Sequence, residues 1–174
     1  RYSHTVSRHR EVLPGRPYLA PPAQGKSNPL NLTEEEFRLI CLETPLDTPL
    51  VELLQRNFEG LSTVTCRELV YRSGLPPETL LDHCGDYELR ALWKALQGVM
   101  APAARGIFTP CLLTGPKGEP VDFAALDLEH TEWSRRHGEM NSLLDVFYTT
   151  REQLQRFNKN KKELSTLLSK ELAR

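Results

Sequence analysis

A proline-rich stretch near the start of the chain limits the fold more than any other feature. Five prolines and two glycines fall between Pro14 and Pro29. Proline fixes φ and removes an N–H donor, so this stretch cannot be the interior of a helix or a central strand. It also holds Tyr18, Leu19 and Leu30, and its charges are almost all basic. A disordered linker would be poorer in such residues, so we expect an ordered, extended, polyproline-like strap that lies over a larger body.

The net charge of −1 hides a segregation of charge along the chain. Residues 1–32 and residues 151–174 each carry a net charge of +4, whereas residues 33–100 carry −6 and residues 101–150 carry −3. The two ends are therefore basic and the middle is acidic. Because clustered positive charge dominates affinity for a phosphate backbone, a polyanion such as RNA should meet the ends first.

A compact helical domain is predicted over residues 33–101. Thr33 can cap a helix, and Glu36 sits three residues later, which is the capping-box arrangement. Apolar residues recur at helical spacing and predict three further helices, over residues 47–58, 63–73 and 86–100. The expected core comprises Leu53, Leu54, Phe58, Leu61, Leu69, Leu89, Leu92, Trp93 and Leu96.

Residues 102–140 differ in character and predict a β-hairpin connection. Residues 107–113 have the apolar pattern of a strand, residues 115–118 form a glycine-rich turn, and residues 120–123 lead into a return strand. The following residues, 130–140, are expected to form a polar connection without regular structure.

Residues 141–174 predict a long helix that enters a coiled coil. The heptad seam consists of Leu143, Phe147, Thr150, Leu154, Phe157, Lys161, Leu164 and Leu168. Its steps alternate between four and three residues over about four heptads, with polar interruptions at Thr150 and Lys161. We expect the first arm of a coiled coil whose other strand is missing from this sequence, and self-association through that arm is a further expectation. The fold class is therefore mainly α.

The link between the second and third predicted helices resembles a helix-hairpin-helix turn. Residues 58–62, Phe-Glu-Gly-Leu-Ser, supply the hydrophobic-x-Gly-hydrophobic pattern and replace the usual second glycine with serine. In such a turn the N–H groups of the second helix point outward, where the helix dipole favours a phosphate. Gly60, Leu61, Ser62 and Thr63 are therefore candidate phosphate contacts. Ser62 or Thr63 should also cap the second helix, which partly satisfies those N–H groups from within.

The competing interpretation is that the hairpin serves packing alone, and the local charge favours it. Glu59 sits in the turn, and no lysine or arginine lies between Arg56 and Arg67. Attraction of a nucleic-acid duplex to this acidic segment by charge is therefore not expected.

The basic ends supply the other candidate RNA contacts. These are Lys159, Lys161 and Lys162 on the predicted arm, and Arg8, Arg10 and Arg16 on the strap. The alternative for the lysines is a solvated helix surface, which is the usual role of a charge run. The alternative for the arginines is contact with a missing N-terminal lobe.

No catalytic, metal-binding or cofactor-binding constellation emerges. The histidines show no H-E-x-x-H or H-x-H spacing, and neither a phosphate-loop pattern nor a serine nucleophile elbow is present. The four cysteines form no C-x-x-C pair, which favours reduced cytosolic thiols. No apolar run approaches the roughly 18 residues of a membrane span. We expect a cytoplasmic protein that is not an enzyme and has neither cofactor nor metal.

Several segments resemble the NFACT family. They are R-x-V-L-P-G-x-x-Y-x-x-P-P-x-Q-x-K-x-N-P at residues 10–29, L-L-x-x-x-F-x-G-L-S at 53–62, R-E-L-V at 67–70, S-G-L at 73–75, P-V-D-F at 120–123 and S-L-L-D-V-F-Y at 142–148. The family comprises the bacterial RqcH proteins, long called fibronectin-binding proteins, and their eukaryotic relative NEMF. In it, the strap joins an N-terminal lobe to a small helical domain.

The resemblance implies a role in ribosome-associated quality control. Such proteins bind a large ribosomal subunit obstructed by peptidyl-tRNA, recruit alanyl-tRNA and direct the untemplated addition of a C-terminal alanine tail. The implied architecture is an N-terminal lobe similar to formamidopyrimidine glycosylases, a helix-hairpin-helix domain, a coiled coil and a small RNA-binding domain. This chain would hold the middle: the end of the lobe in residues 1–32, the helix-hairpin-helix domain in 33–101, the connection in 102–140 and the first coiled-coil arm in 141–174.

Two other function classes compete with this interpretation. The older family name suggests a surface adhesin for fibronectin or fibrinogen, although the sequence shows no secretion signal, wall anchor or repeat. The likeness of the family's lobe to glycosylases suggests an enzyme that acts on DNA. The lack of lysine in the hairpin and the acidic field around it argue against the second class.

Overall fold

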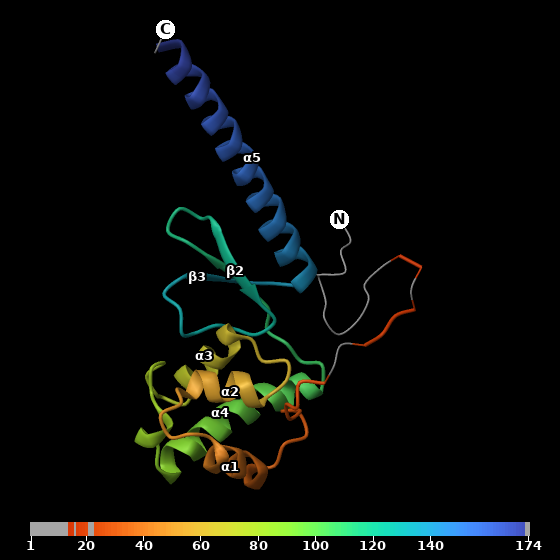
Figure 1. Ribbon diagram of the computed structural model, residues 1–174, viewed down its shortest axis with the longest axis vertical. Coiled ribbons are helices and arrows are strands. Elements are labelled where there is room, and N and C mark those ends of the chain that lie inside the picture. Colours follow the sequence, from red (N-terminus) through yellow and green to blue (C-terminus); the bar gives the residue numbers. More distant parts are fainter. Residues whose placement is uncertain (1–13, 16, 21–22, 173–174) are drawn as a thin grey trace.

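The computed structural model describes residues 14–15, 17–20 and 23–172, apart from the side chains of 167, 168 and 170–172. It is mainly α-helical, as the sequence predicts. Figure 1 shows three parts in order: a helical domain, a small sheet above it, and one long helix that rises from the sheet. The helices of the domain are α1 (Glu34–Glu43), α2 (Leu50–Asn57), α3 (Thr63–Arg72), the 3₁₀ turn η1 (Leu81–His83) and α4 (Asp86–Ala104).

Local sequence signals fix where these helices begin. The capping box at α1 is present: the Glu36 N–H donates to Thr33 Oγ1 at 3.2 Å, and the Thr33 N–H donates to Glu36 Oε2 at 2.8 Å. At α4 the Gly85 N–H donates to Glu88 Oε2 at 2.9 Å in the same manner. The expected end of α4 at residue 100 is wrong, because the helix continues through Pro102 to Ala104.

The core of the helical domain gathers the residues that the sequence predicts. Fully buried members include Leu53, Leu54, Phe58, Leu69, Leu92 and Leu96. Leu61 is also buried, while Leu89 and Trp93 are partly buried and pack against the same cluster. Phe37 joins this core from α1, with its ring centroid 5.5 Å from that of Trp93. One apolar cluster therefore holds α1, α2, α3 and α4 together.

The sheet has three strands rather than the expected two. They are β1 (Cys111–Thr114), β2 (Pro120–Ala124) and β3 (Ser134–His137), in the order β2-β1-β3, and both pairings are antiparallel. Residues 107–110, expected to open the first strand, precede it instead. β3 falls in the segment expected to be a polar connection. All four of its residues are exposed. Its sequence, Ser-Arg-Arg-His, lacks the alternation of apolar and polar residues that marks a half-buried strand.

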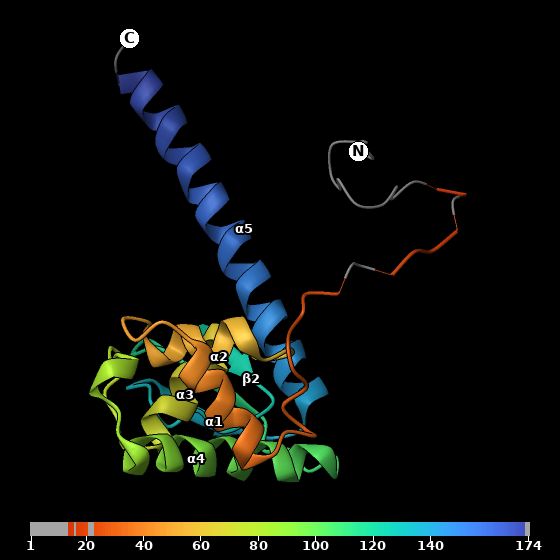
Figure 2. The same cartoon turned by 60° about the horizontal axis from the view of Figure 1, so that its bottom comes forward.

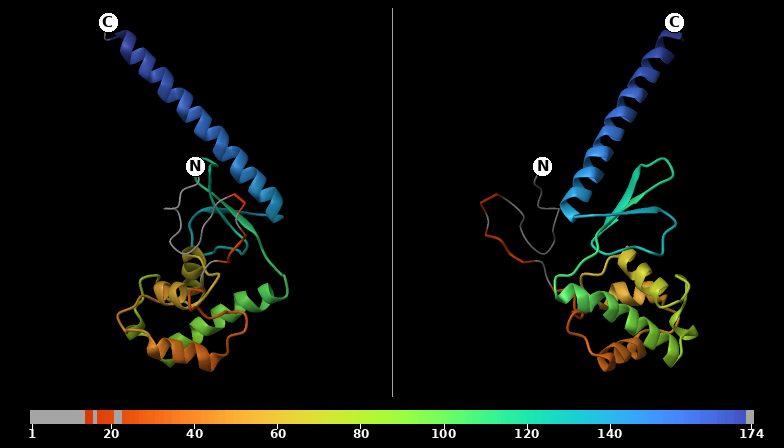
Figure 3. Two further views of the ribbon diagram at one scale, coloured as in Figure 1. Left: turned by 45° about the vertical axis from the view of Figure 1, so that its right-hand side comes forward. Right: turned by 180° about the vertical axis from the view of Figure 1, so that it is seen from behind.

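Helix α5 (Met140–Leu172) forms the arm, and its 33 residues are about 50 Å long at 1.5 Å per residue. Its root packs on the sheet, where Leu143 and Phe147 are buried with Leu112. Beyond the root the helix leaves the sheet, as Figures 1 and 3 show. The seam residues Phe157 and Leu164 are 65% and 61% exposed, so the distal seam is apolar but uncovered. The side chain of Leu168 lies outside the described residues.

The strap divides into an exposed part and a docked part. Tyr18 is 81% exposed, and residues 23–25 are also exposed. From Lys26 onward the strap runs against the helical domain and then turns into α1 (Figure 2). The expectation of a strap lying over a larger body therefore holds in this structure for its second part.

The core assignment predicts a large effect of truncating Leu92, which is fully buried on α4. Leu92→Ala should lower the free energy of unfolding by about 2–5 kcal/mol, because transfer and cavity terms add. The measurement is a urea melt followed by circular dichroism. Leu39→Ala on the exposed side of α1 is the control, and a loss for Leu92→Ala no larger than that of the control would contradict the assignment.

Candidate nucleic-acid interface

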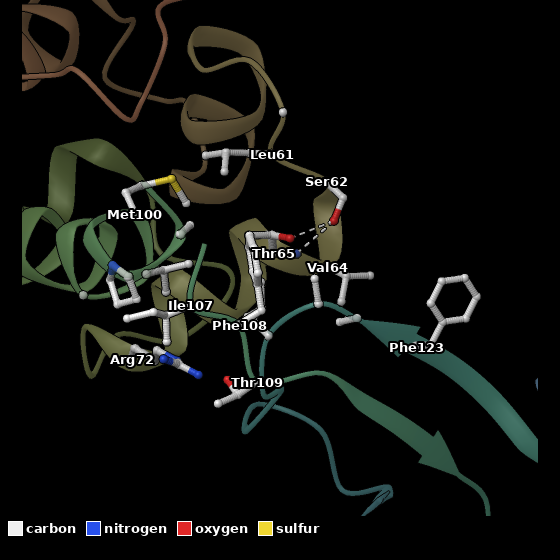
Figure 4. A pocket seen from close by; sticks show the side chains of 18 of the residues that line it. Leu61, Ser62, Val64, Thr65, Arg72, Met100, Ile107, Phe108, Thr109 and Phe123 are labelled. Carbon is white, nitrogen blue, oxygen red and sulfur yellow. Dashed lines mark hydrogen bonds between the residues drawn. The ribbon is translucent and has the colours of Figure 1, made fainter. Parts of the chain in front are cut away.

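The hairpin between α2 and α3 has the geometry that its sequence pattern predicts. α2 ends at Asn57, α3 begins at Thr63, and Gly60 between them has φ of +76°. A Cβ at Gly60 would meet no atom within 4 Å, so glycine is required there by backbone conformation and not by crowding. Ser62 caps α3, since the Thr65 N–H donates to Ser62 Oγ at 3.2 Å (Figure 4). Whether Gly60, Leu61, Ser62 and Thr63 contact a phosphate stays a prediction.

The strap closes one side of this hairpin. Ser27 forms a parallel β-bridge with Phe58: its N–H donates to the Asn57 carbonyl at 2.8 Å, and its carbonyl accepts from the Glu59 N–H at 3.0 Å. Lys26 Nζ donates to the Gln55 carbonyl at 2.8 Å, near the C-terminal end of α2 where the helix dipole favours a cation. The Glu59 N–H of the turn is thus bonded within the protein, which reduces what the hairpin could offer a phosphate.

A cavity of about 540 Å³ lies beside the hairpin, between the helical domain and the sheet. Figure 4 shows Leu61 and Val64 from the hairpin side, Met100 from α4, Phe108 from the segment between α4 and β1, and Phe123 from β2. The lining is mostly apolar, and its charged members are Arg72, which pairs with Glu68, and Asp122 of β2.

The three lysines of the arm do not share one face. Lys159, Lys161 and Lys162 are all exposed on α5. Residues three apart on a helix are neighbours, so Lys159 and Lys162 lie together, whereas Lys161 lies on the seam beside Phe157 and Leu164. Lys159 Nζ is 4.0 Å from Glu163 Oε1, a long and solvent-exposed pair that leaves the lysine available to another anion.

A polar row on the arm, which includes Lys162, was not predicted from the sequence. Arg151, Gln155, Asn158 and Lys162 follow at steps of four, three and four, so they line one side of α5 next to the seam. All four are exposed, and none is acidic. Arg151 lies over the Phe147 ring, with its guanidinium carbon 5.6 Å from the ring centroid. The same 3.6-residue period that revealed the seam could have revealed this row.

The strap arginines lie outside the described residues. Arg8, Arg10 and Arg16 therefore remain predicted RNA contacts, with no position in the structure. Lys26 is the one strap cation among the described residues, and its ammonium group is bonded to a carbonyl.

A buried carboxylate on α3 joins the helical domain to the sheet. Glu68 is fully buried, and Oε1 accepts from Arg72 Nε at 2.6 Å. Oε2 accepts from the Glu129 and His130 N–H groups at 2.8 and 3.0 Å and from His130 Nδ1 at 2.7 Å. Burial alone would raise the pKa of Glu68, but the hydrogen bonds from Arg72 and His130 outweigh it and hold the pKa below its usual value.

Asp127 continues this network to the sheet. Its carboxylate accepts from Arg135 at 2.8 Å and lies 2.8 Å from His137 Nε2, and both partners belong to β3. Partial burial favours a higher pKa for Asp127, yet the contacts with His137 and Arg135 lower it. No sequence motif indicates this network, because its two parts, on α3 and in residues 127–137, lie far apart along the chain.

The cysteines have the character of core residues. All four are free thiols, and Cys41, Cys66 and Cys111 are buried. Burial raises the pKa of Cys41 to about 12 and that of Cys66 to about 11, so both thiols stay protonated at neutral pH. Among the described residues, no three or more histidine, cysteine or acidic side chains come together as a metal site.

No helix in the described part of the chain combines the length and the apolar character that crossing a membrane requires. The architecture is instead that of a small helix-hairpin-helix domain, tied by a buried carboxylate to a three-stranded sheet that carries a long projecting helix. This combination defines a mainly α-helical protein of several parts, whose projecting arm carries the exposed cations Lys159, Lys161 and Lys162.

Comparisons with known proteins identify the family. Residues 1–174 match the model of the NFACT N-terminal and middle domains, so the chain belongs to the NFACT family. It is 30% identical over 172 residues to the Rqc2 homolog RqcH of Bacillus subtilis (strain 168), a match that covers 97% of this chain and 27% of the relative. A crystal structure described as the fibrinogen binding protein from Staphylococcus aureus superposes with a TM-score of 0.59 at 28% identity. That match covers 79% of this chain and 46% of the other.

The positive φ of Gly60 predicts a graded response to substitution. Gly60→Val should destabilise the domain by about 1–3 kcal/mol, because a β-branched residue is strained at positive φ. Gly60→Asn should cost clearly less, since asparagine tolerates this region and no neighbouring atom crowds the site. Thermal melts would compare the two with Ser62→Gly, a cap change worth only a few tenths of a kcal/mol. Equal losses of stability for Gly60→Val and Gly60→Asn would show that steric crowding, and not the backbone conformation, determines the effect.

The lowered pKa of Glu68 predicts a component of stability that depends on pH. A carboxylate with a lowered folded-state pKa stabilises the fold fully above its unfolded-state value, near 4.5, and loses that contribution as pH falls through the folded-state value. Glu68→Gln should therefore be less stable than the parent at pH 7 and should lose less stability between pH 6 and pH 3. Denaturant melts across this range provide the test, with the exposed Glu78→Gln as control. Parallel curves for parent and Glu68→Gln would refute it.

Proposed function

We propose that this chain is the middle segment of a ribosome-associated quality control factor. In the full-length protein it would help to bind obstructed large ribosomal subunits and tRNA, with alanyl-tRNA as the tRNA recruited, and so support C-terminal alanine tailing of stalled chains. The observation that carries the proposal is membership of the NFACT family over the whole chain, with 30% identity to RqcH. The chain spans 27% of that relative, so tailing itself would need parts beyond those described here.

Charge and shape support a binding role for the arm in this proposal. Ribosomal RNA and tRNA are polyanions, so contacts should form where exposed cations are not neutralised by acidic neighbours. The helical domain is acidic, whereas residues 151–174 carry +4. α5 projects from the sheet (Figure 1). The three-residue spacing of Lys159 and Lys162 places both on one side of this helix. The arm would then reach RNA while the helical domain and strap act as its base, in a protein that works in the cytoplasm.

The test compares two pairs of cations on the same helix in the full-length protein. Lys159→Gln/Lys162→Gln removes the neighbouring lysines, and Arg156→Gln/Lys161→Gln removes an equal charge from two cations of α5 that the proposed contact does not need. Arg156 already pairs with Glu152 at 2.7 Å, and Lys161 lies on the seam. The first pair should weaken binding to purified large ribosomal subunits and lower the salt slope of log affinity by about 1.5, at roughly 0.7–0.9 per phosphate contact. The second pair should do much less.

Two outcomes would count against the arm as the RNA contact. One is equal weakening by both variants, which would indicate a loss of general charge. The other is retention of binding by the first variant together with its loss in Arg67→Gln, which would move the contact to the helix after the hairpin. Arg72 is not a suitable control, since it holds the buried carboxylate of Glu68.

A second candidate function is that of a cell-surface adhesin for fibronectin or fibrinogen. The observation in its favour is the structural likeness to the protein described as the fibrinogen binding protein from Staphylococcus aureus. A pull-down with the tagged full-length protein separates the two functions. Recovery of large-subunit ribosomal proteins and tRNA from lysate supports the first, and capture of purified fibrinogen or fibronectin without ribosomal material supports the second.

A further inference from the structure

The helical domain and the sheet are in contact over only part of the surfaces that face each other. Val64 of α3 packs against a buried cluster of Cys111, Leu113 and Leu128 and also lines the cavity of about 540 Å³. This cavity separates the start of α3 and the end of α4 from β2. Figures 1 and 3 show the sheet above the helices, with α5 carried on the sheet. A layer that contacts its neighbour over only part of its surface can tilt unless the attachment is rigid.

Glu68 and Arg72 provide that rigid attachment. The Glu68 carboxylate holds two backbone N–H groups and one ring nitrogen from residues 129–130, all within 3.0 Å. Arg72 donates to the other oxygen of Glu68 at 2.6 Å and to the Asp127 carbonyl at 2.7 Å. An ionised carboxylate can only accept, so His130 must donate from Nδ1. Two side chains of α3 thus hold residues 127–130 from several directions. We call Glu68, Arg72 and His130 together the latch.

The contacts continue without a gap from the latch to the arm. Asp127 binds Arg135 and His137 of β3, and β3 pairs with β1 along its whole length. β1 contributes Leu112 to the cluster that buries Leu143 and Phe147 of α5. The Phe123 ring of β2 meets the Phe147 ring edge-on, with centroids 4.9 Å apart. The orientation of the sheet therefore determines the orientation of α5. Residues 127–130 in turn determine the orientation of the sheet.

We propose that the latch sets the direction of the arm relative to the helix-hairpin-helix domain, which makes Glu68, Arg72 and His130 positioning residues. Lys162 lies 22 residues beyond Met140, about 33 Å along the helix. A tilt of about 10° at the base would move Lys162 by about 6 Å, which is close to the pitch of one helical turn. The effect of such a tilt on RNA binding rests on the proposed function, but the direction of the arm does not.

Spin labels test the direction of the arm without reference to any ligand. The labels are placed at Leu42 on α1 and Ser165 on α5, both exposed, in a protein whose partly exposed Cys84 is replaced by serine. The full-length protein should give a narrow distance distribution by double electron–electron resonance. Glu68→Ala and Arg72→Ala should broaden it or shift its mean by about 5 Å or more, the displacement expected for a tilt near 10°. Lys94→Ala, which removes an exposed cation from α4, should leave it unchanged.

Melting of the helical domain is followed in the same samples, so that a change in arm direction is separated from loss of fold. If Glu68→Ala does not fold, His130→Ala replaces it, because it removes one latch contact from the sheet side and leaves the helical core intact. An unchanged distance distribution in a folded latch variant overturns the proposal. Broadening in Lys94→Ala equal to that in the latch variants also overturns it.

Binding to purified large ribosomal subunits is then measured for the same variants. A broadened arm with weakened binding supports both the latch and the RNA contact. A broadened arm with unchanged binding supports the latch and counts against the arm as an RNA contact. If the latch variants leave the distance distribution unchanged while Lys159→Gln/Lys162→Gln weakens binding, the role of the latch is overturned and the proposed function stands.

Discussion

The hydrogen bonds of one buried carboxylate connect the two halves of this protein. Glu68 has no exposed surface, so its charge is tolerated only because Arg72, His130 and two backbone N–H groups replace the lost water. A buried charge with this many partners specifies one arrangement, since any sliding of the sheet over α3 would leave the carboxylate unpaired. This contact determines the position of the sheet, and therefore also that of the arm that projects from the sheet.

The hairpin between α2 and α3 uses some of its hydrogen-bonding groups for contacts within the protein. Its glycine has the left-handed backbone that the turn requires, yet serine stands where the second glycine is usual, and it caps α3. The strap then uses the Glu59 N–H through the bridge between Ser27 and Phe58. The serine cap and the strap both form hydrogen bonds with N–H groups that would otherwise be open to a ligand. The hairpin therefore acts in this structure as the place where the strap is attached.

The arm combines two surfaces of different chemistry. Its seam is buried only at the root, and farther out it exposes apolar residues such as Phe157 and Leu164, which favours contact with another helix. Beside the seam runs the polar row that ends at Lys162, and this row would stay accessible if a second helix covered the seam. Lys161 belongs to the seam, so the lysine cluster that the sequence suggests divides between the two surfaces.

The sequence by itself determined the helices, the core of the helical domain, the hairpin and the seam, because each depends on short-range periodicity, caps or turn chemistry. It also carried the family resemblance. It could not determine β3, whose exposed Ser-Arg-Arg-His pattern forms a strand only through pairing with β1. Nor could it determine the latch, because Glu68 lies about 60 residues from His130 along the chain. Such contacts depend on long-range packing, so only the tertiary structure decided them and the direction in which the arm points.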